Sequence, residues 1–155
     1  MPPRLLIALA VLLLLVSGRA SGATMCPWLT QGSAAKILGG DVSVSVISAN
    51  ETEGSCTFSR RQGAVVYLFE VSVHKAAGTG CPADGTKLRG IGNEAILCRM
   101  ERSPSETVEE VSGRVRDLYF SVSLGIHGPK SSAMTIEAQR EGVNQAAEQV
   151  AGNLF

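Results

Sequence analysis

Hydrophobic and polar positions alternate with a period of two through the middle of the chain, a pattern typical of half-buried β-strands. The strongest run covers residues 64–74, where one predicted face is wholly apolar: Val65, Tyr67, Phe69, Val71 and Val73. Weaker alternation predicts further strands over 42–47, 55–60 and 95–100, and a hairpin formed by 108–115 and 118–124. Stretches rich in glycine, proline and polar residues predict loops over 75–88 and 125–132.

A period near 3.6 predicts a helix at each end of this strand region. The first covers residues 30–38, with Thr30 as its cap and Gly39 as its stop. The second closes the chain on an apolar stripe of Ile136, Val143, Ala147, Val150 and Leu154. The pattern predicts an α+β domain, with an antiparallel sheet of about five or six strands packed with a short N-terminal helix and a longer C-terminal helix.

The N-terminus has the order of a secretory signal peptide. Arg4 precedes an unbroken apolar run over 5–16, and small residues follow as far as Ala23. This run is shorter than the ~20 apolar residues that span a bilayer. We expect residues 1–23 to be a signal peptide cleaved after Ala23, and 24–155 to form a single globular domain that is secreted or periplasmic. Lipidation of Cys26 is disfavoured because Met25 precedes it.

Composition restricts the partners of this domain. Its acidic and basic residues nearly balance after the leader is removed, so we expect no nucleic-acid partner. It contains no second long apolar stretch, so we expect no transmembrane helix in the mature protein. No cofactor motif is visible, and we expect none to be bound.

Four cysteines lie in the exported part: Cys26, Cys56, Cys81 and Cys98. An even number of cysteines in an exported chain predicts two disulfides. No spacing fits a zinc site. Three pairings satisfy the count, and the spacing alone does not choose among them.

Candidate chemistry is sparse. The two histidines are His74, at the end of a predicted strand, and His127, in a predicted loop; no nucleophile motif accompanies either one. A group of carboxylates lies close together in the sequence: Glu106, Glu109, Glu110 and Asp117. Because neighbouring strand residues point to opposite faces, we expect these carboxylates to be solvated rather than paired for catalysis. An enzyme is therefore disfavoured, and no catalytic or metal-binding residue is assigned.

Two glycine-rich segments invite functional interpretation. Residues 78–85 lack the lysine of a phosphate loop and the carboxylates of a calcium loop, so a disulfide-tethered loop is favoured. The second segment predicts a tight turn and is a candidate partner-binding surface: Gly90, Ile91, Gly92, Asn93 and Glu94.

The order of these features resembles exported actinobacterial lipoproteins of unknown function and the broader PsbP-like proteins. The matching elements are Cys26, Leu29-Thr30, Leu38-Gly39, Cys56-Thr57-Phe58, the turn from Gly90 to Ala95, and the closing helix over 146–154. The resemblance implies a PsbP-like two-layer or sandwich arrangement and a non-enzymatic envelope role. The spacing of Cys26 and Cys56 resembles that of the family and implies a bond stapling the first helix to the sheet, which leaves Cys81 to pair with Cys98.

The sequence favours an extracytoplasmic, non-enzymatic binding or accessory module. Its partner is unknown; we expect an envelope or extracellular protein or a small ligand. A secreted hydrolase using His74 or His127 is one alternative. An inhibitor or structural envelope protein is the other.

Overall fold

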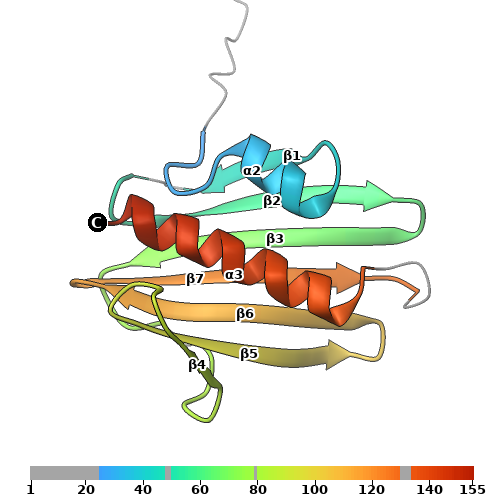
Figure 1. Cartoon of the computed structure of the whole chain (residues 1–155). Coiled ribbons are helices and arrows are strands. Elements are labelled where there is room, and N and C mark those ends of the chain that lie inside the picture. Colours follow the sequence, from blue (N-terminus) through green and yellow to red (C-terminus); the bar gives the residue numbers. More distant parts are fainter. Residues whose placement is uncertain (1–24, 48–49, 79, 130–133) are drawn as a thin grey trace, which may run out of the picture.

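The computed structural model describes residues 25–47, 50–78, 80–129 and 134–155, so the predicted leader lies outside the described residues. The described strands are β1 (Ser43–Ile47), β2 (Gly54–Gln62), β3 (Val65–His74), β4 (Thr86–Leu88), β5 (Glu94–Ser103), β6 (Glu106–Val115) and β7 (Leu118–His127). They form one antiparallel sheet in the order β1-β2-β3-β7-β6-β5-β4. Two helices, α2 (Gln31–Leu38) and α3 (Ile136–Asn153), lie on the same face of it (Figure 1). The predicted α+β class is confirmed.

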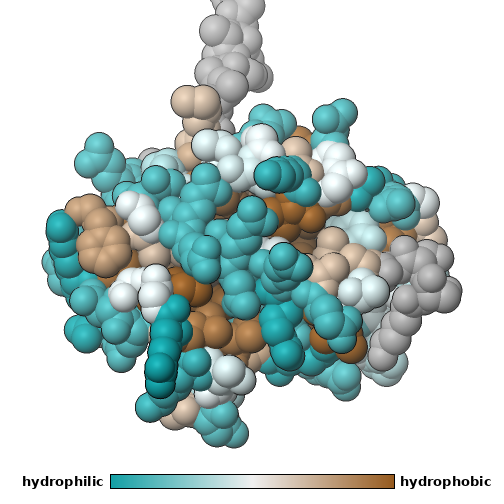
Figure 2. All heavy atoms as spheres, viewed as in Figure 1, coloured by the Kyte–Doolittle hydropathy of each residue, from teal (hydrophilic) through white to brown (hydrophobic). Residues whose placement is uncertain are grey.

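The centre of the sheet is the pairing of β3 with β7. Phe69 lies opposite Leu124 and Val71 opposite Val122, and all four side chains are fully buried. Because both strands alternate, their apolar residues point to the face that the helices cover. Figure 2 shows this face, where hydrophilic side chains lie over hydrophobic residues that remain visible in the gaps.

Local signals fix the ends of the helices. Thr30 Oγ1 accepts a hydrogen bond from the Ser33 amide, and Gly39 ends α2 in the left-handed conformation at φ 72°. Thr135 caps α3 in the same way. Gly142 lies where the two helices approach each other, since a Cβ there would lie 2.8 Å from Ile37 Cγ2. Glycine weakens a helix, but at this position its lack of a side chain allows α2 and α3 to pack closely.

The structure has seven strands where the sequence predicted five or six. The additional strand is β4, a three-residue segment inside the predicted loop 75–88 that pairs with β5. The predicted loop 125–132 is also wrong at its start, because β7 continues to His127. Gly125 is held in the ladder between Leu68 and Val108, and strand partners on both sides override its turn preference.

Both disulfides form with the predicted partners. Cys26 bonds to Cys56 with a Cα–Cα distance of 5.8 Å, which ties the segment before α2 to β2. Cys81 bonds to Cys98 with a Cα–Cα distance of 5.5 Å, which ties the β3–β4 loop to β5. Two such bonds indicate folding in an oxidising compartment outside the cytoplasm.

Candidate functional site

The face of the sheet opposite the helices is rich in hydroxyl groups. Ser55, Ser72, Ser121 and Ser112 are successive cross-strand neighbours on β2, β3, β7 and β6. The same face carries further hydroxyl side chains in neighbouring rows: Ser43, Ser45, Thr57, Ser59 and Ser123. Strand alternation places these small polar side chains opposite the apolar core. The rows that contain Ser72 and Ser121 therefore offer many hydrogen-bonding groups.

A cleft of about 480 Å³ lies on this face, next to the loop that carries Cys81. Its lining includes Ser72, Ser121 and Ser112 from the central strands. A second row of cross-strand neighbours also lines it: His74, Tyr119, Arg114 and Glu94. Arg114 Nε lies 2.9 Å from Glu94 Oε1, so the cation of this row is balanced by a carboxylate.

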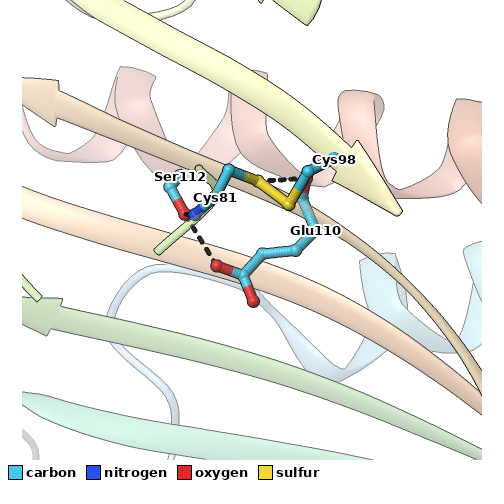
Figure 3. The surroundings of a disulfide bond; sticks show 4 residues. All are labelled: Cys81, Cys98, Glu110 and Ser112. Atoms are coloured by element: carbon cyan, nitrogen blue, oxygen red, sulfur yellow. Dashed lines mark hydrogen bonds between the residues drawn. A yellow bond between two sulfur atoms is a disulfide. The ribbon is translucent and has the colours of Figure 1, made fainter. Parts of the chain in front are cut away.

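The loop beside the cleft is held in place by the second disulfide (Figure 3). The Cys81 amide donates to Ser112 Oγ at 3.0 Å, and that hydroxyl donates to Glu110 Oε1 at 2.7 Å. The Glu110 carbonyl oxygen lies 3.2 Å from Cys81 Sγ. A Cβ on Gly80 would lie 2.2 Å from Ser112 Oγ, so this approach requires glycine. These contacts position one wall of the cleft.

The two histidines do not come together. His74 is exposed at the end of β3 and lines the cleft. His127 pairs opposite Val66 near the start of β3, eight strand positions or about 26 Å away. Its Nε2 lies 3.3 Å from Glu106 Oε1. His74 shares the cleft with Ser112, but that hydroxyl is already engaged by Cys81 and Glu110.

The turn at 90–94 is fixed against the β6–β7 hairpin. Gly90 and Gly92 have φ values of 81° and 61°, which confirms the predicted glycine-dependent turn. The Asn93 amide donates to the Arg114 carbonyl at 2.7 Å, and Ile91 is buried in the core. Of the five candidate residues, Glu94 lines the cleft. A partner-binding role for this turn remains a prediction.

The expectation of a solvated carboxylate face is wrong for two residues. Glu109 is 0% exposed and Glu110 is 8% exposed, whereas Asp117 is exposed and Glu106 half-buried. Glu109 lies on the helix-covered face, in line with Val111 and opposite Leu124 on β7. Glu110 lies on the other face, beneath the loop that Cys81 anchors. Continuing the apolar alternation back from Val115 through Val111 places Glu109 on the core face, a signal that sequence analysis missed.

Burial raises the pKa of Glu109, while the positive charges of Arg140 and Arg99 act in the opposite direction. Within the described residues, no group of three or more histidine, cysteine, aspartate or glutamate side chains is arranged to hold a metal ion. The segment 78–85 is the disulfide-tethered loop that the sequence predicted; Thr79 lies outside the described residues. No helix in the described part of the chain is long and apolar enough to cross a bilayer.

Comparison with known proteins gives no relative for this arrangement: no family model, no curated protein and no solved structure matches the chain.

Proposed function

We propose that this protein is an extracytoplasmic, non-enzymatic binding module whose ligand occupies the hydroxyl-lined cleft. The observation that carries the proposal is the cleft itself, a hollow over a row of serines on a sheet face that neither α2 nor α3 covers. Its volume of about 480 Å³ falls within the range of small-molecule sites. The two disulfides support a location outside the cytoplasm.

The lining favours an uncharged, hydroxyl-rich ligand. Each serine hydroxyl both donates and accepts hydrogen bonds, and Arg114 is already paired with Glu94. Tyr119 adds an aromatic ring with a polar end. A saccharide unit presents the matching chemistry, because it combines many hydroxyl groups with apolar ring faces. The ligand class we propose is therefore a short glycan.

The alternative of a secreted hydrolase rests on His74, which lies in the cleft together with Ser72 and Ser121. Such an enzyme needs a histidine in hydrogen-bond reach of its nucleophile. His127, at the far end of β7, serves this alternative less well. The prediction of an inhibitor or structural envelope protein has no supporting contact in the described residues.

The origin and processing of the chain form part of the same proposal. We propose a signal peptide cleaved after Ala23 and a PsbP-like plan related to the exported lipoproteins, without an acyl group on Cys26. The supporting observation is that Cys26 is bonded to Cys56. An intact-mass measurement of the exported protein should give a chain starting at Thr24. A diacylglycerol adduct on an N-terminal Cys26 would contradict this.

Binding to the cleft can be tested by NMR titration of the oxidised protein with maltotriose, cellotriose and tri-N-acetylchitotriose. We expect one of these probes to shift the amides around Ser72, Ser112 and Ser121. Ser121→Leu should abolish the shifts by filling the cleft. Ser45→Leu is the matched control, because it adds the same side chain on edge strand β1, outside the cleft lining. No response to any probe, or equal binding by both variants, would overturn the glycan proposal.

A further inference from the structure

The helix-covered face holds a charged cluster around Glu109 that the cleft does not use. Glu109 Oε1 lies 3.2 Å from Arg99 Nη1 and 3.7 Å from Arg140 Nη2. The second oxygen, Oε2, is buried and has no hydrogen-bond partner among the described residues. Burying a polar atom without a partner is costly, and such atoms are uncommon in folded proteins. This oxygen therefore lacks one hydrogen-bond donor, which a group entering from the adjoining cavity can supply.

A cavity of about 310 Å³ adjoins this carboxylate. It lies at a notch in the edge of the sheet, because β4 begins at Thr86 opposite Leu97 and leaves the following residues of β5 without a neighbour on that side. The turn at 82–85, closed by the Gly85 amide donating to the Pro82 carbonyl at 3.0 Å, lines the notch. Arg140 from α3 lines the cavity on the helix side.

The charges around this cavity balance. Its ionisable lining consists of two carboxylates and two guanidinium groups: Asp84, Glu109, Arg99 and Arg140. The arginines would attract a simple anion, but Glu109 would repel it. A simple cation would be attracted by Glu109 and repelled by the arginines. A small molecule carrying both charges can satisfy both sides, since guanidinium groups bind carboxylates in a planar, two-bond geometry.

We propose that this cavity binds a small zwitterionic α-amino acid, with its ammonium group donating to Glu109 Oε2 and its carboxylate accepting from Arg99 and Arg140. The volume suits a ligand with a short side chain. The ammonium group supplies the donor that the unpartnered oxygen lacks. Arg99 and Arg140 are 26% and 51% exposed, so their outer N–H groups remain available to an incoming carboxylate.

This site is independent of the glycan cleft. Glu109 and Glu110 are neighbours on β6 but point to opposite faces of the sheet. The cavity and the cleft have no lining residue in common. The two proposals therefore fail separately: glycan probes report on Ser121, and amino-acid probes report on Glu109.

The test uses three probes of similar size on the oxidised, isotope-labelled protein. L-Alanine carries both charged groups, propionate lacks the ammonium group, and ethylamine lacks the carboxylate. We expect alanine to shift the amides of Gly85 and Leu97 and the side-chain signals of Arg99. Propionate and ethylamine should each bind at least about tenfold more weakly than alanine, because each loses one set of charge-assisted hydrogen bonds. Failure of alanine to bind, or an equal response to propionate, would overturn the proposal.

Two variants tie binding to the cluster. Glu109→Gln keeps the size of the side chain but removes its charge, and should abolish alanine binding. Glu70→Gln is the control, because it makes the same change at an exposed position on β3, on the opposite face and outside the cavity lining, and should bind alanine as the unmodified protein does. Arg140→Gln, at a half-exposed position on α3, should weaken binding without threatening the fold. Unchanged binding in Glu109→Gln and in Arg140→Gln would contradict the assignment.

Discussion

The two halves of the sheet hold their disulfides in opposite surroundings. Cys56, on β2, is fully buried in the hydrophobic core, and its bond to Cys26 leads directly to Trp28 and Leu29, each 1% exposed. The Cys81–Cys98 bond instead lies among polar groups of β6, including the Ser112 hydroxyl and the backbone of Glu110. The first bond stabilises packing. The second positions a loop beside two cavities.

Buried polar side chains follow the same division. The described residues contain four such side chains, all on β6, β7 or α3: Glu109, Glu110, Ser123 and Gln139. Gln139 is satisfied by the carbonyls of Thr107 and Leu124 at 3.2 and 2.7 Å. Glu109 is only partly satisfied. Burying such groups costs stability, and their concentration near β6 agrees with our proposal that this half of the sheet carries the binding sites.

Replacing both cysteines of the first disulfide should have the largest effect. The chain-entropy contributions of loops closed over 30 and 17 residues differ by only about 0.5 kcal/mol. Any larger difference between the two pairs therefore reports their surroundings. We expect Cys26→Ala with Cys56→Ala to lower the free energy of unfolding by about 4–5 kcal/mol, because it also loosens Trp28 and Leu29. Urea denaturation measures this.

Replacing the second pair should cost less. Cys81→Ala with Cys98→Ala should lower the free energy of unfolding by about 2–3 kcal/mol, because the Cys81–Ser112 hydrogen bond and the β4–β5 pairing remain. The loop should become sensitive to limited proteolysis between β3 and β4, and binding to both cavities should weaken. Equal losses of stability in the two double variants would break the distinction between the halves.

The reasons for success and failure of the sequence predictions differ between these halves as well. Thr30 and Gly39 fix α2 through local capping, and the alternation in β3 is uninterrupted, so both elements could be predicted. In β6, four consecutive residues from Val108 to Val111 are buried because α3 covers one face and the disulfide-anchored loop lies against the other. The alternation of Val111 and Val115 places Glu109 on the core face, but the charge of the adjacent carboxylates favoured the wrong prediction that both are solvated. β4 is too short to show a period.

Neither cavity could be derived from local patterns. The cleft requires Ser72, Ser121 and Ser112 to be neighbours, which depends on β7 pairing between β3 and β6. The Glu109 cluster joins strands to a helix distant in sequence, since Arg140 lies 31 positions after Glu109. Only the sheet order and the docking of α3 bring these groups together. The disulfide pairing, in contrast, followed from the family resemblance.

The cost of burying Glu109 should appear as a pH dependence. Burial raises the pKa of this carboxyl in the folded state above its ordinary value of 4.5, despite the opposing charges of Arg140 and Arg99. Below the ordinary value both states are protonated and there is no penalty. As pH rises through the window up to the raised pKa, the unfolded state releases its proton first, and folding becomes less favourable.

Glu109→Gln should therefore become more stable relative to the unmodified protein as the pH rises from 4 to 7. Glu94→Gln is the control, because that carboxylate is 64% exposed in its ion pair with Arg114, so its removal should matter little. Urea midpoints at several pH values measure both effects. A relative stability of Glu109→Gln that falls across this range would show that the arginines outweigh burial.

The smallest effect is expected from replacing both histidines. His74 is exposed, and His127 is 39% exposed in its contact with Glu106, so His74→Gln with His127→Gln should change the free energy of unfolding by less than about 0.5 kcal/mol. The double variant also separates the binding and hydrolase proposals, because a hydrolase depends on one of these bases whereas the cleft binds through its serines. The folded variant should still bind the glycan, because the serine row is intact and the side chain introduced by His74→Gln keeps hydrogen-bonding groups in the cleft, and neither protein should hydrolyse p-nitrophenyl acetate above the rate of buffer. If the unmodified protein cleaves this ester and the double variant does not, one of the two histidines acts as a base, and loss of the activity in His74→Gln alone would place that base in the cleft.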